Sequence, residues 1–173
     1  AGAPFFMSEV LNKDTMPYLP KDFVPVARIT STSMVFVVGK KSSSSSLKEL
    51  LDSARQAPGQ IDFAVDPSLG MGAVMELNRL AGVQLRPVPH KDYGTMVSDV
   101  VGGHIHGTVV AASLAAPHVR NGSLKTLGTT TRKRSSMLPE VPTVAESGVP
   151  EYELTPFAGM MASAATPPVV LQK

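Results

Sequence analysis

The sequence predicts an α/β fold, in which a mostly parallel sheet is covered by helices on both faces. Three observations carry this prediction: short apolar runs alternate with amphipathic segments, the connecting loops are short, and turn residues mark the ends. Alternating strands and helices are typical of parallel strand pairs, because a crossover helix returns the chain to the same edge of the sheet. The composition is globular, with 43% hydrophobic and 17% charged residues in 173.

The first predicted strand and helix lie between Met34 and Pro58. Residues 34–38 are apolar and rich in β-branched side chains, which suits a buried strand. After a polar loop, Ser46-Leu47-Lys48-Glu49 matches a capping box, in which the serine accepts from first-turn amides and the glutamate reaches back. Pro58-Gly59 then ends the predicted helix.

The same strand–helix unit recurs along the chain. Glycine or asparagine follows each predicted helix, as expected at helix C-termini. Pro142 suits a first helical position and predicts one more short helix. The other predicted strands are residues 61–65, 85–89, 107–112, 124–130 and 152–163, and the other predicted helices are residues 73–81, 95–101 and 114–120.

Composition excludes several classes of function. The 16 basic and 14 acidic residues nearly balance, and the run Arg132-Lys133-Arg134 reads as a solvated loop, so no nucleic-acid partner is expected. The absence of cysteine excludes disulfides, thiolate metal sites and a cysteine nucleophile. No apolar stretch of the sequence is long enough to span a membrane.

Parallel sheets place ligands at the carboxyl ends of their strands, close to helix N-termini. The unpaired amides and the helix dipole at those ends favour an anion. We therefore expect the ligand to contact three loops: Asp66–Gly72, His90–Gly94 and Ala111–Ser113.

Five segments carry a family resemblance. Residues 88–92 read VPHKD, 100–106 read VVGGHIH, 116–125 read APHVRNGSLK, 138–153 read LPEVPTVAESGVPEYE, and 17–26 read PYLPKDFVPV. Together, these segments resemble the TctC-like Bug family, the periplasmic solute-binding components of tripartite tricarboxylate transporters. The family text is close to VPYKG, LLGGQVD, LPHIKAGKLR, LPDVPTVAEAGLPGYE and PYDPVKDFTPV.

This resemblance implies a periplasmic-binding-protein-like clamshell with the ligand in its cleft. Residues 1–33 and 130–173 would form an incomplete first lobe, and 34–129 a nearly complete second lobe. The opening Ala1-Gly2-Ala3-Pro4 has no signal-peptide features, and both ends read as cuts through a larger protein. The resemblance further implies a periplasmic monomer that binds a small organic acid or amino acid, works with membrane transporter subunits, and catalyses nothing.

The candidate site departs from the family pattern. Gly70 stands where a serine or threonine is usual, although Ser68 could supply the hydroxyl; His90 replaces a tyrosine and Asp92 a glycine. Asp66 and Asp92 would repel a carboxylate unless they face away or bind an amine, which favours an amino acid or a cationic-headed acid. The candidate ligand-binding residues are Asp66, Ser68, Leu69, Gly70, Met71, Gly72, His90, Lys91, Asp92, Ala112, Ser113 and Phe157.

Other interpretations of the same residues are weaker. His104 and His106 could share a strand face, but a metal site needs a third ligand and no cofactor is expected. Ser113 lacks the G-x-S-x-G turn of hydrolases, and Gly70 and Gly72 are not followed by the lysine of a phosphate loop. Two alternatives stay open: a solute sensor that feeds a signalling partner, and a small α/β enzyme.

Overall fold

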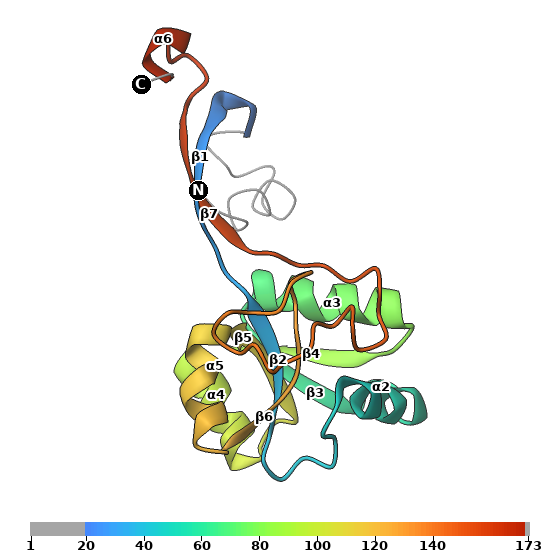
Figure 1. Cartoon of the computed structure of the whole chain (residues 1–173). Coiled ribbons are helices and arrows are strands. Elements are labelled where there is room, and N and C mark those ends of the chain that lie inside the picture. The colour runs from blue at the N-terminus through green and yellow to red at the C-terminus, as the bar shows by residue number, and fades with distance from the viewer. Residues whose placement is uncertain (1–19, 172–173) are drawn as a thin grey trace. The chain divides into compact units, whose positions relative to one another are not determined.

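The structure is a computed structural model that describes residues 20–171. The chain divides into two compact units (Figure 1). One comprises the segments up to Thr32 and from Pro156 onward, and the other is the continuous segment Ser33–Thr155. Each unit has its own sheet, which is two-stranded in the first and five-stranded in the second.

The five-stranded sheet is mixed rather than wholly parallel. Its strands, in spatial order, are β4 (Leu85–Pro89), β3 (Ile61–Val65), β5 (Gly107–Ala111), β2 (Met34–Gly39) and β6 (Leu124–Thr129). The pairs β3–β4 and β3–β5 are parallel, whereas β2 is antiparallel to both β5 and β6. The chain crosses from β5 to β6 over one intervening strand position. The strand β2 occupies that position and runs antiparallel to both neighbours, because the crossover does not fix its direction. The expected parallel order therefore describes every strand except β2.

Helices cover both faces of this sheet, as the alternation predicts. The helices α2 (Leu47–Gln56) and α3 (Leu69–Ala81) lie on one face, and α4 (Tyr93–Gly102) and α5 (Ala112–Arg120) lie on the other (Figure 1). Alternate residues of β2 enter the two cores, because successive strand side chains point to opposite faces. Phe36 belongs to the α2–α3 core and Val37 to the α4–α5 core, and both are fully buried.

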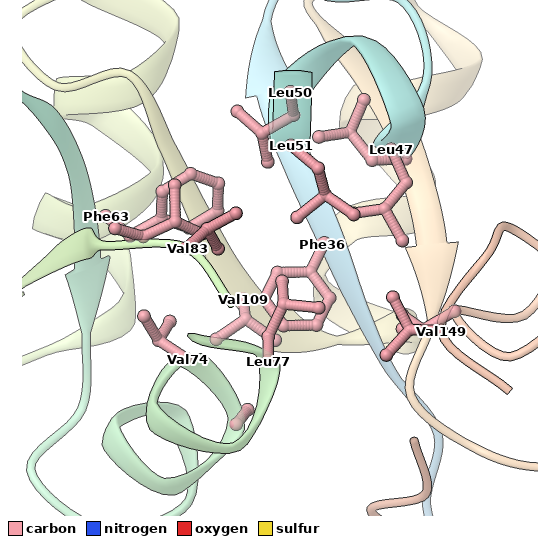
Figure 2. Packing of buried hydrophobic residues seen from close by; sticks show 14 of the residues in the cluster. Phe36, Leu47, Leu50, Leu51, Phe63, Val74, Leu77, Val83, Val109 and Val149 are labelled. Atoms are coloured by element: carbon pink, nitrogen blue, oxygen red, sulfur yellow. The ribbon is translucent and has the colours of Figure 1, made fainter. Parts of the chain in front are cut away.

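The α2–α3 core is built around Phe36. Leu47, Leu50 and Leu51 point from α2 into this core, and Leu77 of α3 lies beside Phe36 (Figure 2). The Phe36 ring centroid is 6.1 Å from that of Tyr152, and the two rings are nearly perpendicular. The Tyr152 hydroxyl donates to the Ala73 carbonyl at 3.1 Å, and burial raises the pKa of this tyrosine well above its usual range. The core therefore ties α2, α3 and the segment around Tyr152 to the sheet.

The segment 130–155 packs with the five-stranded sheet, so the compact unit ends at Thr155 rather than at the expected boundary near residue 130. Val144, Val149 and Tyr152 are buried in the α2–α3 core, and Thr143 makes a parallel bridge with Thr129. Packing of this segment against the sheet removes these apolar side chains from water, which explains the later boundary.

The helix predicted at Pro142 is wrong, because the chain forms turns there. The local cap signal is nonetheless satisfied. The Thr143 hydroxyl accepts from the Glu146 amide at 3.0 Å, and the Glu146 carboxylate accepts from the Thr143 amide at 2.7 Å. Gly148, with φ 108°, then redirects the chain before a helix can extend. The strand expected from Tyr152 begins only at Phe157, because Tyr152 is held in the core.

The other unit is an antiparallel ribbon of β1 (Phe23–Ser31) and β7 (Phe157–Ser163). It is flanked by a short 3-10 helix, η1 (Pro20–Asp22), and by α6 (Pro168–Leu171). Most of its residues are exposed, and Phe157 lines a shallow apolar pocket of about 140 Å³ with Met160 and Met161. A two-stranded ribbon is marginally stable by itself.

Candidate functional site

The carboxyl ends of β3 and β4 lead into α3 and α4, which places the candidate residues at one edge of the sheet. The helix α3 begins at Leu69 rather than at the expected Ala73, so Leu69, Gly70, Met71 and Gly72 belong to the helix and not to a loop. Likewise α4 begins at Tyr93 rather than Thr95. The open loops at this edge are therefore shorter than the sequence suggests.

Asp66 explains the early start of α3. Its Oδ1 accepts from the amide and the hydroxyl of Ser68, at 3.0 and 2.6 Å, and from the Leu69 amide at 3.0 Å. Its Oδ2 accepts from the Gly70 amide at 2.8 Å. The amides at a helix start lack hydrogen-bond partners within the helix. A carboxylate accepts hydrogen bonds from them, and its negative charge interacts favourably with the positive end of the helix dipole. The anion-binding position at the start of α3 is thus occupied by the Asp66 carboxylate of the chain itself.

Gly70 makes room for that carboxylate. A Cβ at position 70 would lie 2.7 Å from Oδ2 of Asp66 and 3.3 Å from Cβ of Val65, both closer than ordinary contact. Any side chain there would displace the carboxylate or the end of β3. Gly70 and Asp66 are therefore a matched pair, which accounts for the glycine where the family pattern has a hydroxyl residue.

Asp92 caps α4 in a simpler way. Its Oδ1 accepts from the Thr95 amide at 2.9 Å, and the Thr95 hydroxyl lies 3.0 Å from its Oδ2. Two hydrogen bonds hold the pKa of Asp92 below its usual value: the one from the Thr95 amide has the larger effect, and the one from the Thr95 hydroxyl the smaller. Asp92 is exposed, unlike the half-buried Asp66.

His90 is held by two acceptors. Its Nδ1 lies 2.9 Å from the Val88 carbonyl oxygen, and its Nε2 lies 3.0 Å from Oδ2 of Asp99 on α4. Only the imidazolium form donates to both, and the Val88 carbonyl, with Asp99, raises the pKa of His90. Because its side chain is 13% exposed and both nitrogens already have acceptors, His90 is better placed to hold the loop in position than to bind a ligand.

These residues border a recess of about 380 Å³. Five of the predicted site residues line it: Asp66, Ser68, His90, Lys91 and Asp92. Pro67 and Tyr93 also line it; both lie in loops that are expected to contact the ligand, although neither is among the candidate residues. Met96 lines it as well and lies outside those loops, three residues from Tyr93 on one helical face, so a correct start for α4 would have identified it.

The remaining predicted residues lie elsewhere. Leu69, Gly70, Met71 and Gly72 form the first turn of α3 behind the lining. Ala112 is buried and Ser113 exposed at the start of α5, whose N-cap residue makes no side-chain cap. Phe157 lies in the β1–β7 ribbon, in the other compact unit.

The charged groups of the recess differ in their partners. Asp66 and Asp92 accept hydrogen bonds from helix amides, and the His90 ring is hydrogen-bonded to Asp99. Lys91 is exposed, and it makes no hydrogen bond or ion pair with any residue between 20 and 171. Burial, and then the charge of Asp66, raises the pKa of Tyr93 above its usual value.

His104 and His106 lie at a different place on the unit, outside the recess at the ends of β3 and β4. The His106 Nδ1 accepts from the Asp62 amide at 3.0 Å, and His104 and His106 both line an open recess of about 370 Å³ with Lys41 and Ser42. Within the described part of the chain, no three histidine or acidic side chains are grouped so that they could hold a metal ion. Nor does that part contain a helix of the length and apolarity needed to cross a membrane.

A mixed sheet covered by helices on both faces is also found in solved structures whose fold matches nearly the whole chain, among them a periplasmic transporter and the periplasmic binding protein BugD. The model of the tripartite tricarboxylate transporter family receptor matches residues 3–173, and the chain belongs to this family.

Individual relatives agree with this assignment. BugT of Bordetella pertussis is 32% identical over 163 residues, which are 90% of this chain and 50% of BugT. The R. palustris protein Rpa4515, solved with adipate, has a TM-score of 0.78 and 31% identity, over 92% of this chain and 54% of that one. MatC of Rhodopseudomonas palustris, solved with bound malate, has a TM-score of 0.80 and 23% identity, over 98% of this chain and 58% of MatC. The chain thus spans about half the length of these relatives.

Proposed function

We propose that this chain is part of a periplasmic solute-binding protein that binds a small organic acid or amino acid without chemical change. The protein would deliver its ligand to membrane subunits of a tripartite transporter and work as a monomer. The observation that carries the proposal is the recess at the ends of β3 and β4, in which Lys91 and Tyr93 offer a charge and a hydroxyl to a polar ligand. Adipate in Rpa4515 supports the ligand class.

The chemistry of the recess favours binding over catalysis. A catalytic site needs a nucleophile, a base that touches it, and a group that orients the base. The Ser68 hydroxyl donates to Asp66, which also accepts from three amides. The two ring nitrogens of His90 are bonded to the Val88 carbonyl and to Asp99, and the Ser68 hydroxyl is bonded to Asp66 instead. These groups hold the loops in shape.

The two compact units suggest a division of labour. We infer that Ser33–Thr155 forms most of one lobe, which contributes the recess, and that the β1–β7 ribbon belongs to the other lobe. Limited proteolysis of the full-length protein would test this division, because cleavage should fall near Thr32 and Pro156 before it reaches the sheet. Early cleavage within residues 130–155 would contradict it.

Isothermal titration calorimetry on the full-length protein tests the function itself. The panel should hold dicarboxylates, hydroxy acids, aromatic acids and amino acids. At least one ligand should bind with one-to-one stoichiometry, and mass spectrometry should recover it unchanged. Turnover of any ligand, with no stable binding across the panel, would contradict the proposal.

Lys91 offers a sharper version of the same test. The variant Lys91→Gln should weaken binding of an organic acid about tenfold, because this lining lysine has no hydrogen-bond or ion-pair partner within the described residues. Lys48→Gln on α2 is the matched control, since Lys48 is exposed and lies outside the recess. Equal effects of the two variants would show that Lys91 acts only through net charge.

A further inference from the structure

The start of α3 is already filled by a carboxylate of the chain. We propose that Asp66 is a specificity-determining residue: it excludes a ligand carboxylate from the α3 terminus, so that the ligand turns an uncharged or hydrogen-bond-donating group toward this side of the recess. The inference rests on the proposed function, because it concerns which part of a bound solute faces the β3–α3 loop.

Every amide at this turn has a partner within the chain. The Ser68, Leu69 and Gly70 amides donate to the Asp66 carboxylate. The next two also donate internally, Met71 to the Asp66 carbonyl at 3.0 Å and Gly72 to the Ser68 carbonyl at 3.1 Å. A ligand carboxylate could use these donors only by displacing Asp66, and the displaced charge would then lack its partners.

The charge around Asp66 makes a second anion unfavourable there. Asp66 and Asp92 both line the recess, and the His90 ring, which also lines it, is hydrogen-bonded to the Asp99 carboxylate. Lys91 remains as the lining cation without a partner among residues 20–171, and it lies on the β4–α4 loop rather than beside α3. A ligand carboxylate is therefore attracted to the Lys91 side and repelled from the Asp66 side.

Asp66 can accept more than it does. Among residues 20–171, its Oδ2 accepts a hydrogen bond from the Gly70 amide, and a carboxylate oxygen has capacity for about two. A ligand amide, hydroxyl or ammonium could donate to that oxygen without disturbing the turn. The recess thus fits a solute with an acid at one end and a donor at the other.

Matched ligand pairs test this orientation. Calorimetry on the full-length protein should compare each linear diacid of four to six carbons with its monoamide, which has nearly the same shape but one charge fewer. The wild type should bind the best monoamide about tenfold more tightly than the corresponding diacid, the size expected for one unfavourable charge placed near a helix-bound carboxylate. In Asp66→Ala the preference should vanish or reverse, because the α3 amides become available.

Three further variants separate the causes. Gly70→Ala keeps the charge but pushes the carboxylate from its amides, so it should shift the preference in the same direction and add nothing in the Asp66→Ala background. Asp66→Asn keeps an acceptor oxygen without the charge, which guards against loss of folding in the alanine variant. Ser46→Ala removes a side-chain cap from α2, outside the recess, and should leave the preference unchanged.

Each outcome has a defined meaning. If the wild type binds diacids as tightly as monoamides, or if Asp66→Asn and Gly70→Ala leave the preference unchanged, the inference is overturned while the proposed function stands. If the wild type binds nothing in the panel, the proposed function falls and takes the inference with it. Rapid hydrogen exchange of the Leu69 and Gly70 amides in the free wild type would also overturn the inference, without reference to any ligand.

Discussion

The starts of α3 and α4 look alike in sequence but are built differently. Both follow a strand end and both use an aspartate, yet Asp66 accepts from three backbone amides and a hydroxyl, whereas Asp92 accepts from one amide and one hydroxyl. Asp66 is half-buried and Asp92 is exposed. The same residue type therefore organises a whole turn at one junction and only caps a helix at the other, and the difference lies in how many donors the local backbone presents.

The largest expected effect separates the two aspartates. Asp66→Ala should lower the free energy of unfolding by about 2 kcal/mol, because it leaves several helix-start amides without a partner. Asp92→Ala should have a clearly smaller effect, since water can replace its single amide contact. Urea denaturation of both variants at neutral pH measures the difference, and equal losses would show that the two junctions are equivalent.

The neighbouring glycines give the next contrast. Gly70→Ala should destabilise by about 1–2 kcal/mol, because the new methyl group would lie 2.7 Å from the Asp66 carboxylate. Gly94→Ala should be neutral or slightly stabilising, since its nearest atom is the Asp92 carboxylate at 3.2 Å and alanine favours the helix. Thermal unfolding of the pair gives the sign of each change. A destabilised Gly94→Ala with an unaffected Gly70→Ala would invert the comparison.

The third contrast concerns acid. The Thr95 contacts lower the pKa of Asp92 in the folded state, so its contribution is present above its usual value near 3.8 and disappears as pH falls through the lower folded value. Stability curves of wild type and Asp92→Asn should therefore converge at low pH. A difference that persists undiminished below pH 3 would indicate a cause other than ionisation.

The smallest expected effect is at His90. Its pKa is raised by the Val88 carbonyl and by Asp99, so the stability that it contributes is present below its usual value of 6.5 and is lost as pH rises through the higher folded value. The variant Asp99→Asn should flatten this part of the pH profile without moving the acid limb. NMR titration of the His90 ring follows the same change directly, and an unchanged ring titration in the variant would show that Asp99 has no part in it.

Local signals located most elements because their causes are local. The Ser46 cap is found as predicted, with the Glu49 amide 3.2 Å from the serine hydroxyl, although the Glu49 carboxylate reaches Ser45 rather than Ser46. Gly82 and Gly103 end their helices with positive φ, as their positions suggest. The sequence predicts later starts for α3 and α4 than the structure has, because the aspartates that begin these two helices resemble loop residues when their hydrogen-bond partners are unknown.

The sequence by itself determined the alternation of strands and helices, the two-faced core, and the family, because hydrophobic spacing, caps and motif order are written along the chain. Only the tertiary structure decided that β2 runs in reverse, that residues 130–155 complete the larger unit, and that Asp66 fills the start of α3. The first two depend on contacts between residues far apart in the sequence, which a linear pattern does not specify. The third depends on hydrogen bonds within residues 66–70, whose geometry is known only once the turn has formed. The sequence predicts ligand contacts in the loops after β3 and β4, and the hydrogen-bond partners of each carboxylate there come only from the structure.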